Sequence, residues 1–247
     1  AYFLGLFTAD GHLSETGNMS IVSKNRSFLN DIANSIDSKV NFRKNEHGPG
    51  ETRYKATFRS DDAEHIVRFS GYTGGYKADK LFFPEWIPET LVLDFIRGYL
   101  DGDGCIYANQ DNLLRMSFTS ICKDFLIELR NKLCQKLGVR GTLVKHKREA
   151  DNHHNCYLLK YAHFETRLIA EKVFPGDTPS LKRERWYNLQ NQVKTDVEKR
   201  VWLKHEEDFL KNNYKDMSNE KIASFFSKSQ SAVRRKAGEL NLTDNTQ

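Results

Sequence analysis

Apolar residues recur at intervals of three and four positions in two long stretches of the chain, with polar residues between them. The first stretch runs from Phe28 to Ile36 and the second from Phe125 to Leu137. This spacing gathers the apolar side chains on one face of a helix. The sequence therefore predicts two amphipathic helices, each with one buried side.

Strict alternation of apolar and polar residues follows the first of these helices. Tyr54, Ala56 and Phe58 alternate with polar residues, and Val40 and Phe42 do the same in a neighbouring stretch. A period of two predicts strands with one buried and one open face. A solvated charged face is the usual explanation for such a pattern. The open positions here are Lys39, Asn41, Arg43, Arg53, Lys55, Thr57 and Arg59.

The second half repeats the alternation less cleanly. Apolar and polar residues alternate over 114–119, and residues 142–148 supply further cations. The polar positions of these two stretches are Arg115, Ser117, Thr119, Lys145, Lys147 and Arg148. They predict a second basic sheet. The stretch 157–161 is ambiguous, because both Leu158 and Lys160 stand at the positions between its apolar residues.

Two short apolar segments, residues 3–11 and 96–104, end in the same way, with an acid followed by glycine. Small residues lie four positions apart in each segment: Gly5 with Ala9, and Gly98 with Gly102. Residues with this spacing share one face of a helix, so each helix has a nearly bare face. We expect the two bare faces to pack against each other, backbone to backbone.

This packing would place Asp10 and Asp103 side by side at the ends of their helices. We expect Gly11 and Gly104 to adopt a left-handed backbone conformation and to stop each helix just after its acid. A carboxylate at a helix C-terminus is unfavourable, because the helix dipole is already negative there. Two such carboxylates together predict a site for a divalent cation.

The two segments resemble the paired LAGLIDADG motifs of homing endonucleases, in the single-chain form that carries both copies on one polypeptide. The resemblance implies an α+β fold of pseudo-symmetric tandem repeats. Each repeat would run helix, two strands, helix, two strands, helix, with saddle-shaped antiparallel sheets. The alternative is two ordinary amphipathic helices with acidic ends. The first copy departs from the family at Thr8, where an acid is frequent, but keeps Asp10 at the metal-ligand position.

In that family the acid before the final glycine binds the catalytic metal, so the resemblance implies a site for Mg²⁺ or Mn²⁺. The candidate ligands are the carboxylates of Asp10 and Asp103 and the backbone carbonyls of Ala9 and Gly102. A metal neutralises charge on the phosphate and lowers the pKa of the attacking water. The resemblance also implies a basic residue near each metal, here Lys160 and Arg59. Since arginine does not readily release a proton, Arg59 would act electrostatically.

The same resemblance implies a double-stranded DNA partner. Saddle-shaped sheets that carry Arg, Lys, Asn and Thr suit the major groove, so the polar positions named above for both sheets are candidates for DNA contact rather than only a solvated face. Two such sheets end to end would cover roughly fifteen base pairs. Because the two copies differ in sequence, we expect a monomer that cuts both strands of an asymmetric target with short 3′ overhangs. An intron or intein is the implied host element, and host-intron RNA is a candidate second partner.

From about residue 196 the chain builds a separate small core. Trp202, Phe209 and Leu210 mark one predicted helix, while Ser218 and Ser229 would cap two more. Their order resembles the helix-turn-helix of Myb-like DNA-binding modules, whose third helix enters the major groove. By this resemblance the candidates for base or phosphate contact are Ser229, Gln230, Ser231, Arg234, Arg235 and Lys236. The alternative is a small helical bundle, such as a protein-binding appendage.

Changes in composition divide the chain into three units. Residues 73–88 are rich in turn formers and proline and predict a linker between the two copies. Residues 173–179 mark a second break, which the charged run 182–185 follows. We therefore expect a first LAGLIDADG repeat at 1–83, a second at 84–195, and a small all-α three-helix domain at 196–247.

Composition agrees with this picture. The net charge of the 247 residues is +5, which is compatible with a polyanionic partner. The four cysteines lack CxxC spacing, which argues against a zinc ribbon or a disulfide framework and favours a reducing intracellular compartment such as cytoplasm, nucleoid or organelle matrix. We expect no membrane span and no signal peptide. Because the sequence opens inside the first motif without a methionine, we expect that residues upstream have been removed.

Other functions are compatible with this fold. A protein of this kind can lose cleavage and act as a DNA-binding regulator or an RNA-splicing maturase. The presence of both acids favours a divalent-metal-dependent endodeoxyribonuclease, because a pure binding module has no need of carboxylates that face phosphate. An unrelated hydrolase with paired carboxylates would fit the basic strands poorly.

Overall fold

The computed structural model describes the chain except for residues 47–51, 73–80, 147–155, 193–201, 227 and 243–247. The order helix, two strands, helix, two strands, helix occurs twice, as expected. The first copy consists of α1 (Tyr2–Asp10), β1 (His12–Leu13), β2 (Met19–Ser23), α2 (Arg26–Ser35), β3 (Lys39–Glu46), β4 (Thr52–Arg59) and α3 (Asp61–Phe69). The second consists of α4 (Val92–Asp103), β5 (Gly104–Ala108), β6 (Leu114–Ser120), α5 (Lys123–Leu137), β7 (Thr142–His146), β8 (Cys156–Tyr161) and α6 (His163–Val173).

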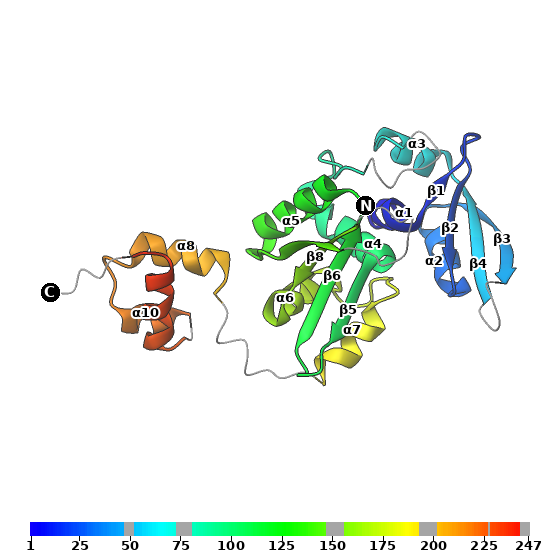
Figure 1. Cartoon of the computed structure of the whole chain (residues 1–247). Helices are drawn as coiled ribbons and strands as arrows, with labels where there is room; N and C mark the ends of the chain where they lie inside the picture. The colour runs from blue at the N-terminus through cyan, green and yellow to red at the C-terminus, as the bar shows by residue number, and fades with distance from the viewer. Residues whose placement is uncertain (47–51, 73–80, 147–155, 193–201, 227, 243–247) are drawn as a thin grey trace.

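Each copy forms a four-stranded antiparallel sheet with the same topology. The strand orders are β1-β2-β4-β3 and β5-β6-β8-β7. Figure 1 shows α1 and α4 side by side between the two sheets. The α+β class and the tandem repeat architecture are therefore confirmed.

The small residues of the two motif helices allow this close approach. A Cβ at Gly5 would stand 1.9 Å from the backbone oxygen of Phe95, and a Cβ at Gly102 would stand 2.3 Å from the Cβ of Ala9. Residues near the start of α1 face residues near the start of α4, and residues near the two C-termini also face each other. The helices therefore run parallel, and their acidic ends meet. The prediction of backbone-to-backbone packing is confirmed.

The predicted left-handed caps at Gly11 and Gly104 are wrong. Both residues are extended, with φ of −77° and −104° respectively. A strand starts at once after each helix, and Gly104 is itself the first residue of β5. Space rather than backbone freedom requires glycine, because a Cβ at Gly11 would lie 2.3 Å from the Phe7 ring, and one at Gly104 would lie 2.3 Å from the Leu100 side chain.

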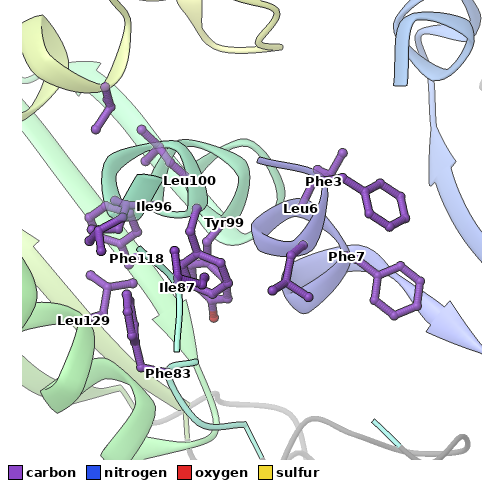
Figure 2. Packing of buried hydrophobic residues seen from close by; sticks show 14 of the residues in the cluster. Phe3, Leu6, Phe7, Phe83, Ile87, Ile96, Tyr99, Leu100, Phe118 and Leu129 are labelled. Carbon is purple, nitrogen blue, oxygen red and sulfur yellow. The ribbon is translucent and has the colours of Figure 1, made fainter. Parts of the chain in front are cut away.

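One continuous hydrophobic cluster spans both copies. Phe3 and Phe7 on α1 point toward the first sheet, and the ring of Phe3 lies edge-on to Phe58 of β4 at 6.1 Å (Figure 2). On the other side, Tyr99 of α4 packs against Phe118 of β6. The two motif helices thus form the shared centre of the core.

The predicted amphipathic helices are observed as α2 and α5, whose apolar faces are buried. The charged run 182–185, which follows the predicted break at 173–179, leads into the helix α7 (Arg183–Gln190), and α7 buries Trp186. No helix of the described chain combines the length and the apolarity needed to cross a membrane.

The C-terminal region forms three helices with a hydrophobic cluster of their own. They are α8 (Lys204–Asn213), α9 (Asn219–Phe225) and α10 (Gln230–Glu239). The side chains of Ser218 and Ser229 accept hydrogen bonds from the first turns of α9 and α10, as predicted. Figure 1 shows this unit on the side of the second copy.

Candidate functional site

Asp10 and Asp103 are the last residues of two helices that meet. A Cβ at Gly102 would stand 3.1 Å from Oδ2 of Asp10, so the Asp10 carboxylate lies against α4 one residue before Asp103. Asp10 is exposed and Asp103 is half-buried. The structure therefore brings the two predicted acids to one place that solvent or a ligand can reach.

A third charged group at this place is the ammonium of Lys182, just before α7. It donates hydrogen bonds to the backbone oxygen of Leu100 at 2.7 Å and to that of Asp101. These carbonyls belong to the last turn of α4, where the helix dipole is negative. Burial lowers the pKa of Lys182, while the charges of Asp101, Asp10 and Asp103 oppose that change. Lys182 is thus a cation within electrostatic reach of both candidate ligands.

Asp101 anchors the segment that carries Lys182. Its buried carboxylate accepts hydrogen bonds from the Tyr2 hydroxyl at 2.6 Å, the Ser180 hydroxyl at 2.8 Å, and the backbone N–H groups of Leu181 and Lys182 at 3.1 and 3.0 Å. Burial raises the pKa of Asp101, and these hydrogen bonds act in the opposite direction. Asp101 therefore ties the start of α1, the end of α4 and the start of α7 together.

The sequence did not single out Lys182 as a site residue, because it lies in a highly charged run that is typical of a solvent-exposed loop. A signal was present in the apolar pair Trp186 and Leu189, whose spacing of three suggests a helix. Lys160, the lysine predicted as the basic residue near one metal, lies exposed on β8 opposite Ser117 and Thr142. Arg59 ends β4 opposite Lys39. Their part in the chemistry stays a prediction.

The donor groups at the two acids suit a hard divalent cation. Carboxylate and backbone carbonyl oxygens are the protein ligands that Mg²⁺ and Mn²⁺ prefer. Within the described residues, no group of three or more His, Cys, Asp and Glu side chains could hold a metal ion. A cation at Asp10 and Asp103 would therefore complete its coordination with carbonyls such as those of Ala9 and Gly102, with water, or with a bound phosphate.

The first sheet presents the predicted polar face. Lys39 lies opposite Arg59, Asn41 opposite Thr57, and Arg43 opposite Lys55. Directly opposite residues share a face. Arg53 alternates onto the same side, and the interleaved residues such as Phe58 are buried. All seven residues predicted for this sheet therefore line one open face.

The second sheet matches the prediction only in part. Arg115, Ser117 and Thr119 share the open face with Lys160, because Ser117 pairs with Lys160. Lys145 lies opposite Tyr157, which places it on the other face, toward the helices. The hairpin register decides this, and residue spacing alone does not reveal it. Lys147 and Arg148 lie outside the described residues.

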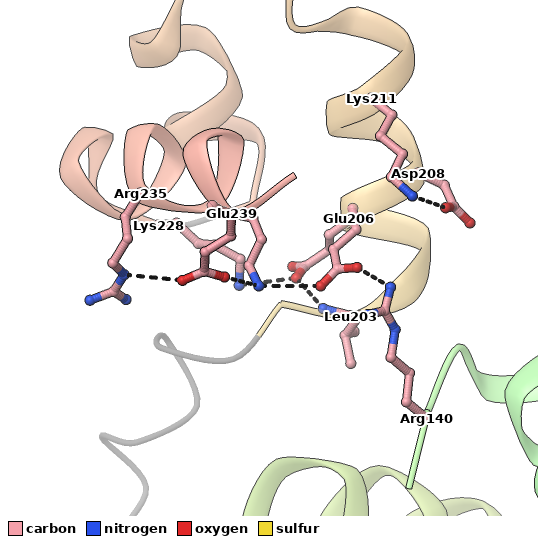
Figure 3. Close-up of polar contacts among 10 residues, drawn as sticks. Arg140, Leu203, Glu206, Asp208, Lys211, Lys228, Arg235 and Glu239 are labelled. Carbon is pink, nitrogen blue, oxygen red and sulfur yellow. Dashed lines mark hydrogen bonds and ion pairs between the residues drawn. The ribbon is translucent and has the colours of Figure 1, made fainter. Parts of the chain in front are cut away.

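At the N-cap of α10 and along this helix, five of the six predicted contact residues are exposed: Ser229, Gln230, Ser231, Arg234 and Arg235. Lys236 differs, since its ammonium lies 3.4 Å from the Glu207 carboxylate and 2.6 Å from that of Glu239. Glu207 also pairs with Arg140, which follows α5. These ion pairs form a network that links α8 and α10 of the C-terminal unit to Arg140 of the second copy (Figure 3). Two carboxylates thus hold the ammonium of Lys236 within this unit, which makes Lys236 a weaker candidate for DNA contact than the exposed Arg234 and Arg235.

Comparison with known proteins shows which folds this chain is similar to. Residues 90–173 match the family model described as LAGLIDADG-like domain. No curated protein matches the sequence at a significant level. Full-length DUF199/WhiA from Thermotoga maritima superposes with a TM-score of 0.51 at 11% identity, over 97% of this chain and 88% of that one.

The N-terminal LAGLIDADG domain of DUF199/WhiA superposes with a TM-score of 0.50 at 11% identity, over 74% of this chain and 84% of that one. The homing endonuclease I-DmoI, solved in complex with DNA and Ca, does so with a TM-score of 0.50 at 16% identity, over 76% of this chain and 95% of that one. The chain therefore has the fold of the LAGLIDADG homing endonucleases, extended by a helical C-terminal region.

Proposed function

We propose that this chain is a divalent-metal-dependent endodeoxyribonuclease that cuts both strands of a long, asymmetric duplex target and acts as a monomer. The observation that best supports this proposal is that Asp10 and Asp103 come together at the ends of α1 and α4, between two sheets that have polar open faces. The fold shared with I-DmoI, whose structure contains DNA and Ca, supports this function.

Each part of the site has a role in this proposal. Asp10, Asp103 and the neighbouring carbonyls would hold Mg²⁺ or Mn²⁺, which supplies charge neutralisation at the phosphate and a more acidic water. Lys182 provides positive charge beside the acids, where it offsets the negative end of α4. The open faces of the sheets bind the phosphates and base edges on either side.

Cleavage of a randomised duplex library with Mg²⁺ tests the proposal. We expect the wild-type protein to cut both strands at one long sequence. Asp10→Asn and Asp103→Asn should each abolish cutting, whereas Asp31→Asn, an exposed acid on α2, should leave it unchanged. Cutting that survives both motif substitutions would contradict the proposed active site, and a palindromic selected target would contradict the asymmetry.

A DNA-binding regulator without cleavage is the second candidate. Full-length DUF199/WhiA aligns with 97% of the chain, which includes the C-terminal helices as well as the two repeats. If the wild-type protein binds one sequence tightly in the library experiment and cuts nothing, the regulator is the better account.

The C-terminal unit would extend the DNA footprint. Arg234 and Arg235 are exposed on α10, the third helix of this unit, and we propose that α10 binds DNA as the third helix of a Myb-like module does. A tethered module adds affinity through its effective concentration near the duplex, even when its own binding is weak.

A further inference from the structure

The two sheets can be compared position by position, because their strand registers match. His12 and Cys105 each follow a motif acid by two residues, and they pair with Ser20 and Ser117 respectively. From Ser20 and Ser117, cross-strand pairing continues over the other strands of each sheet. We name the residues paired in this way on each open face the acid-side row: Ser20, Thr57 and Asn41 in the first sheet, and Ser117, Lys160 and Thr142 in the second. Every member of the acid-side row is polar in both copies.

The next row along the strands differs between the copies. We name it the neighbouring row. In the first sheet it contains Val22, Lys55 and Arg43, and in the second it contains Thr119, Leu158 and Val144. Val22 and Thr119 are comparable in size. The other two positions change from two cations to two aliphatic side chains.

Leu158 and Val144 lie on the open side of their sheet. They share that face with Lys160, and both are partly exposed. Their neighbours Leu143 and Tyr157 alternate onto the other face and pack against the hydrophobic core. The core therefore does not account for these two aliphatic residues.

The chemistry of the two neighbouring rows suits different bases. Arginine and lysine donate hydrogen bonds to O6 and N7 of guanine in the major groove. Aliphatic side chains contact the C5-methyl group of thymine. Arg115 and Lys160 on the same open face make a polyanionic duplex a better occupant of the second sheet than an apolar protein surface.

We propose that the two sheets read their half-sites by different chemistry: the first sheet selects guanine through Arg43 and Lys55, and the second selects thymine methyl groups through Leu158 and Val144. This inference rests on the proposed DNA partner. It fixes the orientation of the protein on its target, with guanines under the first sheet and thymines under the second.

Base analogues placed in one half of the selected DNA target at a time test this assignment. Deoxyuridine in place of thymine removes the methyl group, and 7-deazaguanine removes the N7 acceptor. Binding of the full chain is measured without divalent cations, one modified half at a time. We expect deoxyuridine to weaken binding about fourfold for each contacted methyl group. We expect 7-deazaguanine to weaken it at least about fivefold. Each analogue should act in a different half.

Protein variants connect each response to its sheet. Leu158→Ser combined with Val144→Ser should abolish the deoxyuridine response and keep the 7-deazaguanine response. Arg43→Met combined with Lys55→Met should do the reverse. Val22→Ser, an exposed apolar position of the first sheet, is the matched control and should keep the response of the deoxyuridine-sensitive half.

The outcomes separate this inference from the proposed function. Equal deoxyuridine responses in both halves, or a response that survives the Leu158 and Val144 substitutions, would overturn the split between the sheets while leaving a DNA-binding protein. A selected site without thymine in the second half would do the same. Failure of the wild-type chain to bind any duplex selectively would overturn the proposed function itself and this inference with it.

Discussion

A Cβ on Gly98 of α4 would stand 2.1 Å from the backbone oxygen of Tyr2 on α1. Gly5 of α1 is equally confined by the backbone of α4. At these two glycines the main chains of the two helices therefore touch directly. This contact fixes how far apart Asp10 and Asp103 lie, so core packing and site geometry depend on the same glycines.

Gly98→Ala should lower the free energy of unfolding by about 3 kcal/mol or more, because the new methyl group must push two packed backbones apart. Urea denaturation measures the change. Gly238→Ala is the control: it lies in α10, a Cβ there would meet nothing within 4 Å, and helix propensity predicts a gain of up to about 1 kcal/mol. Equal stabilities of the two variants would show that α1 and α4 can move apart at little cost.

Local sequence patterns were sufficient to predict much of the fold. Alternation around Tyr54 and Phe58 gave the correct buried face of β4, because a strand has a fixed period of two. Glycines four apart predicted the packed faces of α1 and α4, because a helix brings such residues together. Both relationships are contained within single elements of secondary structure.

Features that depend on long-range contacts could not be predicted in this way. Lys182 contacts carbonyls of α4 that lie about eighty residues earlier. The face of Lys145 follows from its pairing with Tyr157, which hairpin register sets. Lys236 has a helical spacing that suits DNA contact, yet Glu207 of another helix binds its ammonium. In each case the deciding partner is distant in sequence.

Lys182→Met should reduce cleavage at least about a hundredfold while DNA affinity changes only a few-fold. The substitution removes the cation beside Asp10 and Asp103 and leaves the last carbonyls of α4 without their donor. Single-turnover cleavage and separate binding titrations measure the two effects. Lys182→Arg keeps the charge and should restore part of the rate. Lys172→Met, an exposed lysine on α6, should cleave normally. Normal cleavage by Lys182→Met would remove this lysine from the site.

Asp101→Ala should destabilise the protein by about 2–4 kcal/mol, since the hydroxyls of Tyr2 and Ser180 and two backbone N–H groups lose their common acceptor. Limited proteolysis should cut near residues 174–182 faster in this variant. Asp111→Ala, an exposed acid in the β5–β6 turn, should leave both measurements unchanged. An Asp101→Ala protein as stable and as resistant as wild type would mean that other contacts hold this segment.

Glu207→Gln should loosen the C-terminal unit. The Glu207 carboxylate is buried and pairs with Arg140 and Lys236, so its neutralisation removes the partner of Arg140 and one of the two carboxylates that Lys236 contacts, at a cost of about 2 kcal/mol. Hydrogen exchange of α8 and α10 should rise. Asp208→Asn, next to it on α8, breaks only an exposed pair with Lys211 and should cost less than about 1 kcal/mol. Unchanged exchange in Glu207→Gln would show that the hydrophobic cluster alone holds the unit.

Truncation near residue 195 should keep cleavage but weaken DNA binding and reduce its salt dependence, because fewer phosphates are then neutralised. In the full chain, Arg234→Ala with Arg235→Ala should reproduce part of this change and lower the salt slope by about one to two. Lys236→Met should leave the slope unchanged, since its ammonium is already paired with Glu207 and Glu239. Binding titrations over a range of salt concentrations compare all four proteins. A slope that is the same with and without the C-terminal unit would mean that its helices do not contact DNA.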